Sequence, residues 1–171
     1  MPKTWFPLES NPAVMNDYVK SLGVNTDKFC FQDVLSTEEW ALEMIPQPVV
    51  AVIMLFPIKE STECHRALES ERILSNGQYV DPAVYFMKQT VGNACGTVGI
   101  LHAVANALPF VEISPDSFLS KFYSQTSSLT PDEIAAYLEQ DNEIEEHHVI
   151  AASEGQSAQE GDPDTHFICF R

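Results

Sequence analysis

The stretch from Ala94 to Leu108 limits the possible folds of this 171-residue chain more than any other segment. Its spacing predicts a helix that is apolar on several sides, with Val98, Ile100 and Leu101 spread around its surface. Such a helix has to be surrounded by other elements, because none of its sides favours water. We therefore expect it to lie at the centre of one domain that covers residues 1–171.

Two apolar segments predict strands beside this helix. Val49–Phe56 is a short apolar run closed by Pro57, as in a buried strand. His166–Phe170 is a second run of this kind, and it follows Ala151–Asp164, whose Ser, Gly, Gln and acidic residues favour a flexible loop.

Cap residues, several of them followed by proline, mark the starts of the other predicted helices. Helices are predicted to begin at Asn11-Pro12, Ser36, Ser114-Pro115 and Thr130-Pro131, a short one over Pro82–Thr90, and a polar linker with helical character over Glu60–Asn76.

Composition excludes several classes of function. The formal charge of −16 argues against nucleic-acid binding, which needs Lys and Arg on phosphates. The N-terminus has no signal peptide pattern and no apolar run is long enough to span a bilayer, so we expect a soluble, cytoplasmic protein without membrane contact. The four cysteines show no metal-ligand spacing, and we expect neither a metal nor a cofactor.

Acidic residues gather between Asp132 and Asp164, and no Lys or Arg lies between Lys121 and Arg171. The simpler interpretation is a solvated surface and loop. The alternative is an acidic rim that attracts a basic polypeptide.

Cys95 falls at the predicted start of the central helix, where free N–H groups and the helix dipole favour a thiolate. A loop could bring the Gln89 amide beside it, so that this amide and the Cys95 N–H stabilise an oxyanion. Taken alone, a single cysteine is more often structural than catalytic.

A thiol nucleophile needs a base, and five histidines are candidates: His65, His102, His147, His148 and His166. His102 lies about two turns beyond the sulfur on the same helix, His65 lies in the polar linker, and His147 and His148 are expected to be solvated. His166 opens a strand directly after the loop, and such a position can hold an imidazole rigidly. From the residues alone, the pairing of Cys95 with His166 is a hypothesis.

Several segments together are similar to the ubiquitin C-terminal hydrolases, most of all to their small single-domain, L3-like members. The segments are Val84–Thr90, Asn93–Thr97 and Leu101–Asn106, with Trp5–Pro12, Val50–Ile58 and His166–Ile168 in support. The resemblance covers essentially the whole chain.

The resemblance implies a papain-like α+β fold, with a central antiparallel sheet flanked by helices and a chain path that is knotted in the full-length family. It implies Cys95 as nucleophile, His166 as general base and acid, and Gln89 as oxyanion donor. The implied reaction is cleavage of amide, ester or isopeptide bonds after the C-terminal glycine of ubiquitin.

Further implications concern partners. Leu8, Glu9 and Ser10 correspond to a segment that contacts ubiquitin, and residues 147–164, with Glu154, Gly155 and Gln156, correspond to the active-site crossover loop. Some members also process Nedd8, and we expect a monomer.

The sequence departs from the family after His166. The motif that delivers the orienting aspartate is absent here, so we expect an incomplete fold and an incomplete triad. A catalytically incomplete ubiquitin-binding fragment or isoform is therefore one alternative. A thiol redox protein that uses Cys95 is another, although no resolving cysteine lies nearby in the sequence.

Overall fold

The computed structural model describes residues 3–156 and 164–171. Its elements, in chain order, are α1 (Pro12–Ser21), α2 (Glu39–Leu42), β1 (Val52–Pro57), α3 (Glu60–Asn76), α4 (Cys95–Ala105), α5 (Phe118–Thr126), α6 (Pro131–Gln140), α7 (Asn142–Glu154) and β2 (Thr165–Phe170). The described residues form helices and a small two-stranded antiparallel sheet, and the predicted α+β class is confirmed.

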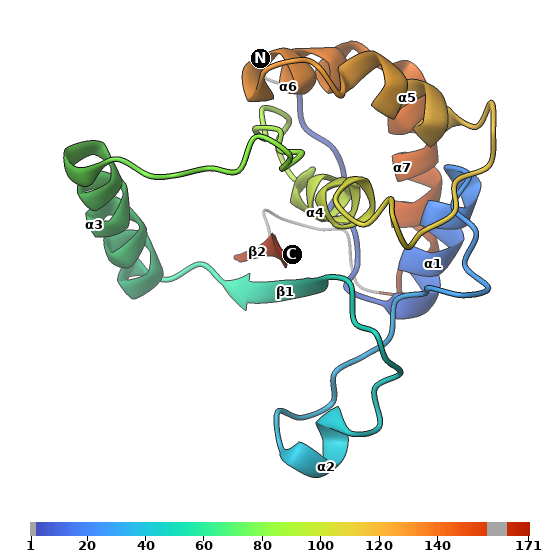
Figure 1. Cartoon of the computed structure of the whole chain (residues 1–171), viewed down its shortest axis with the longest axis horizontal. Coiled ribbons are helices and arrows are strands. Elements are labelled where there is room, and N and C mark those ends of the chain that lie inside the picture. Colours follow the sequence, from blue (N-terminus) through green and yellow to red (C-terminus); the bar gives the residue numbers. More distant parts are fainter. Residues whose placement is uncertain (1–2, 157–163) are drawn as a thin grey trace.

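Helix α4 lies at the centre, with the strands on one side and α1, α5, α6 and α7 on the other (Figure 1). Ile100 and Leu101 are almost completely buried, which confirms the prediction of a central helix. Helices α1 and α7 pack against each other on one side, and Phe167 of β2 is buried in the same core. Burial of this apolar helix is the main favourable term that organises the fold.

Strands β1 and β2 pair antiparallel, and the register places Phe56 opposite His166. The expectation that Val49–Phe56 is a buried strand is wrong in part, because Val52, Met54 and Leu55 are exposed. One face of the two-stranded sheet lies against α4, and no described element covers the other face. An apolar run predicts that a strand favours burial, but burial also needs a layer to pack against it.

Local capping signals fixed the starts of α1 and α6 as predicted. Asn11 accepts a hydrogen bond from the Ala13 N–H at 2.9 Å, and Thr130 and Glu133 form a reciprocal capping box. The predicted start of α5 at Ser114-Pro115 is wrong. Ser117 caps that helix, because Asp116 takes a left-handed conformation with a φ of 61° and no helix can run through it.

Three further expectations need correction. Residues 82–90 form no helix, because the side chain of Asn106 holds the Tyr85 N–H and carbonyl, both at 2.8 Å, in place of helical partners. Residues 60–76 are a continuous helix without a buried residue, not a linker. Residues 147–154 belong to α7, so the segment expected to be a loop begins at Gly155. The rest of that segment, residues 157–163, lies outside the described residues.

No helix in residues 3–156 or 164–171 is long and apolar enough to cross a membrane.

Candidate active site

Cys95 is the first residue of α4 and is partly exposed. Ala94 occupies the N-cap position and offers no side-chain cap. The first-turn N–H groups and the positive end of the helix dipole therefore remain available to a negative charge at this end. This is the environment that favours a thiolate and an oxyanion.

The turn before Cys95 is held by the N-terminal segment. The Trp5 N–H donates to the Gly92 carbonyl, and the Gly92 N–H donates to the Lys3 carbonyl, both at 2.9 Å. Asn93 then takes a left-handed conformation with a φ of 60°, which turns the chain into the helix. Hydrogen bonds with the N-terminal segment therefore fix the path of the chain that leads to Cys95.

Gln89 lies on the exposed surface before this turn, and its side-chain amide donates to the Val91 carbonyl at 3.1 Å. The segment that leads to it is anchored on α4, because the Met87 N–H donates to Nε2 of His102 at 3.1 Å. Burial lowers the pKa of His102, which keeps this imidazole neutral and able to accept. The sequence excluded His102 as a base but missed this role in anchoring the loop.

His166 lies on β2 near the end of α4 that carries Cys95. Phe167 reaches within 3.4 Å of the place a Cβ on Gly96 would take, and Arg171 donates to the Asn106 carbonyl at 2.7 Å. The strand therefore follows α4 from its start to its end. Among the described residues, Cys95 and His166 share no hydrogen bond, although Phe167, next to His166, packs beside Gly96, next to Cys95.

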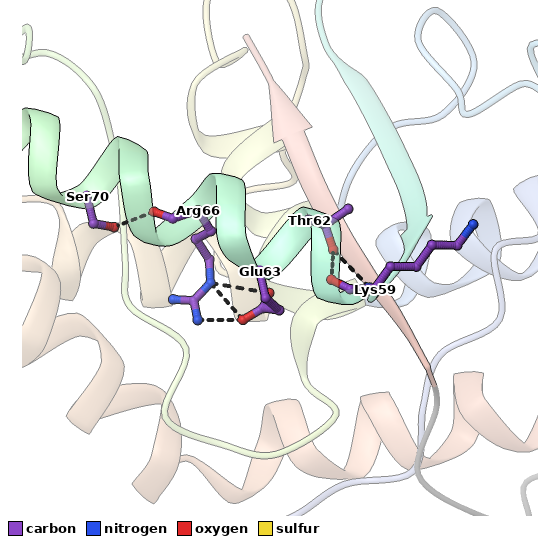
Figure 2. Close-up of polar contacts among 5 residues, drawn as sticks. All are labelled: Lys59, Thr62, Glu63, Arg66 and Ser70. Atoms are coloured by element: carbon purple, nitrogen blue, oxygen red, sulfur yellow. Dashed lines mark hydrogen bonds and ion pairs between the residues drawn. The ribbon is translucent and has the colours of Figure 1, made fainter.

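The His166 ring packs edge-on against Phe56, with ring centroids 5.9 Å apart. Glu63 on α3 lies within electrostatic range of this ring. The pKa of the Glu63 carboxyl is lowered mainly by its hydrogen bonds with Arg66, with a smaller contribution from His166. Figure 2 shows Glu63 turned toward Arg66, which holds the carboxylate at 2.6 Å.

The three residues expected to contact ubiquitin have different surroundings. Leu8 is 4 % exposed, and its Cβ lies 3.0 Å from the place a Cβ on Gly96 would take. Glu9 is partly buried and its carboxylate lies 3.1 Å from the equivalent position on Gly155. Ser10 is exposed. The segment therefore lies between α4, which begins at Cys95, and the residues that follow α7.

The three residues assigned to the crossover loop lie at the end of α7. Glu154 is the last residue of the helix, and Gly155 and Gln156 follow it. Their position beside Glu9 places the start of this segment next to the N-terminal residues.

The expectation that His148 is solvated is wrong, because this side chain is completely buried. It lies next to Trp5 and shares a hydrogen bond with Thr97, two positions beyond Cys95. His147 is also only partly exposed, and its Nδ1 lies 3.0 Å from the Ser21 hydroxyl. The sequence did not predict this burial. The residues around the two histidines are acidic, and the apolar positions, such as Ile144 and Ala151, give only a weak helical pattern.

The other cysteines lie apart from this arrangement. Cys30 and Cys64 are exposed, and Cys169 lies on β2, where burial raises the pKa of its thiol. Within the described ranges, no group of three or more His, Cys, Asp or Glu side chains is arranged to hold a metal ion.

Comparison with known proteins identifies the family of the chain. The family profile of ubiquitin carboxyl-terminal hydrolase, family 1, matches residues 5–171. Ubiquitin carboxyl-terminal hydrolase 3 of Arabidopsis thaliana is 46 % identical over 168 residues, which is 98 % of this chain and 71 % of the relative. The L1 isozyme of Monodelphis domestica is 41 % identical over 164 residues, which is 96 % of this chain and 72 % of the relative.

Solved structures agree with the fold. The catalytic domain of Trichinella spiralis UCH37, bound to ubiquitin vinyl methyl ester, superposes with a TM-score of 0.62 at 20 % identity, over 97 % of this chain and 69 % of that one. At this identity the likeness concerns the fold alone, and it confirms the predicted fold class. The profile match and the sequence relatives show that this chain belongs to the ubiquitin carboxyl-terminal hydrolases of family 1, a family of thiol hydrolases.

Proposed function

We propose that the chain acts as a deubiquitinating thiol hydrolase that cleaves amide, ester or isopeptide bonds after the C-terminal glycine of ubiquitin. The observation that carries the proposal is Cys95 at the uncapped start of α4, with the strand of His166 packed along the same helix. Helix N-terminus, thiol and imidazole are the parts that acyl transfer through a thiolate requires.

In the proposed reaction, His166 takes the Cys95 proton and the thiolate attacks the carbonyl carbon of the terminal glycine. The negative charge moves to the carbonyl oxygen, where the Cys95 N–H and a Gln89 amide hydrogen stabilise it. The scissile bond breaks, His166 gives its proton to the leaving group, and a thioester remains. Water, deprotonated by His166, then hydrolyses the thioester and restores the thiol.

Binding of ubiquitin is assigned to the N-terminal segment and to the residues after α7. Leu8 supplies a rigid anchor on Gly96, whereas Glu9 and Ser10 lie nearer the surface. Glu154, Gly155 and Gln156 begin the segment that a leaving group has to pass. Nedd8 is a second candidate substrate, and we propose a cytoplasmic monomer.

The test uses ubiquitin with a C-terminal vinyl methyl ester, which captures a nucleophilic cysteine without needing a leaving group. The purified chain should gain the mass of one ubiquitin, and Cys95→Ala should abolish the adduct. Cys64→Ala, which removes an exposed thiol on α3, is the matched control and should label like the unmodified chain. An adduct that survives Cys95→Ala would remove Cys95 from the role of nucleophile.

A second candidate function is ubiquitin binding without turnover. Two observations favour it. Among the described residues, Cys95 and His166 share no hydrogen bond. The Glu63 carboxylate bonds with Arg66, and not with the His166 ring that an acidic residue would have to orient. Hydrolysis of a fluorogenic ubiquitin C-terminal amide separates the two. Turnover that is lost in Cys95→Ala supports the hydrolase, whereas binding without turnover supports the second function.

A further inference from the structure

His148 is a buried titratable group that the proposed reaction does not use. It makes two hydrogen bonds, one with the Thr97 hydroxyl at 2.8 Å through Nδ1 and one with the Phe6 carbonyl at 2.6 Å through Nε2. The Trp5 ring packs on it, with centroids 4.5 Å apart. These contacts come from α7, from α4 and from the N-terminal segment, three parts of the chain that are distant in sequence.

The partners determine which ring nitrogen carries the proton. A carbonyl can only accept, so Nε2 has to be the protonated nitrogen. In a neutral ring Nδ1 then accepts from the Thr97 hydroxyl, whose oxygen lies 3.0 Å from the Tyr18 hydroxyl and accepts from it. The result is a directed chain of three hydrogen bonds. The Tyr18 hydroxyl donates to Thr97, the Thr97 hydroxyl donates to Nδ1 of His148, and Nε2 of His148 donates to the Phe6 carbonyl.

The surroundings favour the neutral ring. Burial lowers the pKa of His148, and the bond to the Phe6 carbonyl and the charge of Glu145 oppose this shift only in part. Glu145 is paired with Lys3 at 2.7 Å, and Tyr18 is buried, which raises the pKa of its hydroxyl. A proton on Nδ1 would turn this nitrogen into a donor and break the directed chain at Thr97.

The residues joined by His148 are neighbours of those that the proposed function uses. Thr97 lies in the first turn of α4, two positions after Cys95 and next to Gly96, on which Leu8 packs. Phe6 lies two positions before Leu8, in the segment whose Glu9 lies beside Gly155. We propose that His148, as a neutral imidazole, is a positioning residue that ties the N-terminal segment to the first turn of the Cys95 helix.

This inference rests on the proposed function in one respect, the assignment of ubiquitin contacts to the N-terminal segment. Its consequence is that the surface that receives ubiquitin and the turn that carries the thiol are held as one unit. Pre-organised surfaces of this kind lower the entropy that binding has to overcome. His148 therefore supports affinity for ubiquitin, and it takes no part in the transfer of protons at Cys95.

The first experiment examines the unmodified chain by nitrogen NMR of ¹⁵N-labelled histidines. We expect the His148 ring to show a protonated Nε2 and an unprotonated Nδ1, unchanged as the pH falls through about 6.5, where an ordinary histidine takes up a proton. A protonated Nδ1, a mixture of tautomers or an ordinary titration would overturn the inference.

The second experiment uses two variants that each keep one of the bonds. The amide of His148→Gln can replace Nε2 and donate to the Phe6 carbonyl, whereas that of His148→Asn can replace Nδ1 and accept from Thr97. Hydrogen exchange at the Trp5 and Gly92 amides reports on the N-terminal segment. We expect His148→Asn to accelerate it about tenfold, as for the loss of one buried hydrogen bond, and His148→Gln to restore most of the protection.

Two controls separate this effect from a general loss of stability. His147→Gln changes the neighbouring histidine, and it should leave exchange at Trp5 and Gly92 unchanged. The amides of α6 that exchange by local opening of that helix do not depend on the bonds of His148, and they should exchange at the same rate in all variants. Equal effects of His148→Asn and His148→Gln, or acceleration in α6 as large as that at Trp5, would contradict the positioning role.

The third measurement is labelling by ubiquitin vinyl methyl ester. His148→Asn should raise the concentration for half-maximal labelling and leave the limiting rate unchanged, and His148→Gln should restore the concentration. A lower limiting rate at unchanged half-maximal concentration would overturn the role in binding. If the unmodified chain gives no adduct, the proposed function fails, while the tautomer and the exchange rates still decide whether His148 holds the segment.

Discussion

Gly96, the residue after Cys95, lies where two other segments approach α4 closely. A Cβ at this position would lie 3.0 Å from the Leu8 Cβ and 3.4 Å from Phe167. At Gly99, one turn further along, the nearest atom is the Phe167 Cβ at 3.8 Å, an ordinary contact distance. Packing therefore requires glycine at the first position and tolerates a methyl group at the second.

This difference predicts opposite effects of two similar substitutions. Gly99→Ala should raise the free energy of unfolding by up to about 1 kcal/mol, because alanine is the better helix former. Gly96→Ala should lower it by about 1–2 kcal/mol, since overpacking at Leu8 costs more than the helix propensity returns. Urea unfolding of the two variants beside the unmodified chain measures both, and equal effects would show that Leu8 can move aside.

Single residues also show where sequence reasoning ends. Cys95 could be placed at a helix start, because the helix pattern and the preceding turn are local. The burial of His148 could not be predicted, because its partners Phe6 and Thr97 lie 142 and 51 positions away. Leu8 was expected at a binding surface, and its close packing on Gly96 likewise depends on the tertiary fold.

At the scale of elements, the helices whose first residues are Pro12 and Pro131 were predicted because cap and proline are neighbours in sequence. The end of α7 at Glu154 was not predicted, because the Ser, Gly, Gln and acidic residues from Ala151 onward favoured a loop. The antiparallel pairing of β1 with β2 depends on contacts across more than half of the chain, and the sequence pattern indicated only that both are strands.

Helix α7 carries the buried His148 and α4 the partly buried His102, and this predicts how stability changes with pH. Burial lowers the pKa of both His102 and His148. The two imidazoles therefore stay neutral in the folded state at pH values where they take up protons in the unfolded state. Their contribution to stability is complete above the unfolded pKa of about 6.5, and it is lost as the pH falls below that value. Each histidine adds a slope of up to about 1.4 kcal/mol per pH unit.

Urea unfolding at a series of pH values on both sides of this pKa measures the effect. The free energy of unfolding should fall with pH, and His148→Gln should remove one histidine's share of the slope. His147→Gln is again the matched control and should retain the slope of the unmodified chain. A stability that is independent of pH in this window would show that neither histidine is held neutral by the fold.

Across the whole molecule, several acidic residues lie in the first turns of helices. Asp132 and Glu133 lie in the first turn of α6, and Glu143 and Glu145 in the first turn of α7, where they complement the helix dipoles. This supports the simpler interpretation of the acidic segment without excluding attraction of a basic tail. With a formal charge of −16, the protein as a whole should still attract a basic partner over several ångströms.

Salt separates the two interpretations. If the acids attract ubiquitin, raising the salt concentration should weaken binding several-fold, because exposed charges are screened beyond about 8 Å at physiological ionic strength. Replacing Glu143 and Glu146 by glutamine should reduce this salt dependence. Replacing Glu60 and Glu71, on the distant α3, removes the same charge and should leave it intact. Calorimetric titration measures each affinity, and an affinity independent of salt would count against attraction by the acids.

Helix α3 stands away from the rest of the molecule (Figure 1), has no buried residue, and is bounded by the Lys59–Thr62 pair at its start (Figure 2) and by Gly77 at its end. It carries Arg66 and Arg72, both exposed. A trypsin nick there would divide the chain into two pieces that the strand pairing, the α1–α7 contact and the Trp5–Gly92 bonds still hold together. The segments before and after α3 therefore pack against each other, and α3 only links them. This helix is a natural place for an inserted tag, or for a division of the chain into separately expressed fragments that reassemble.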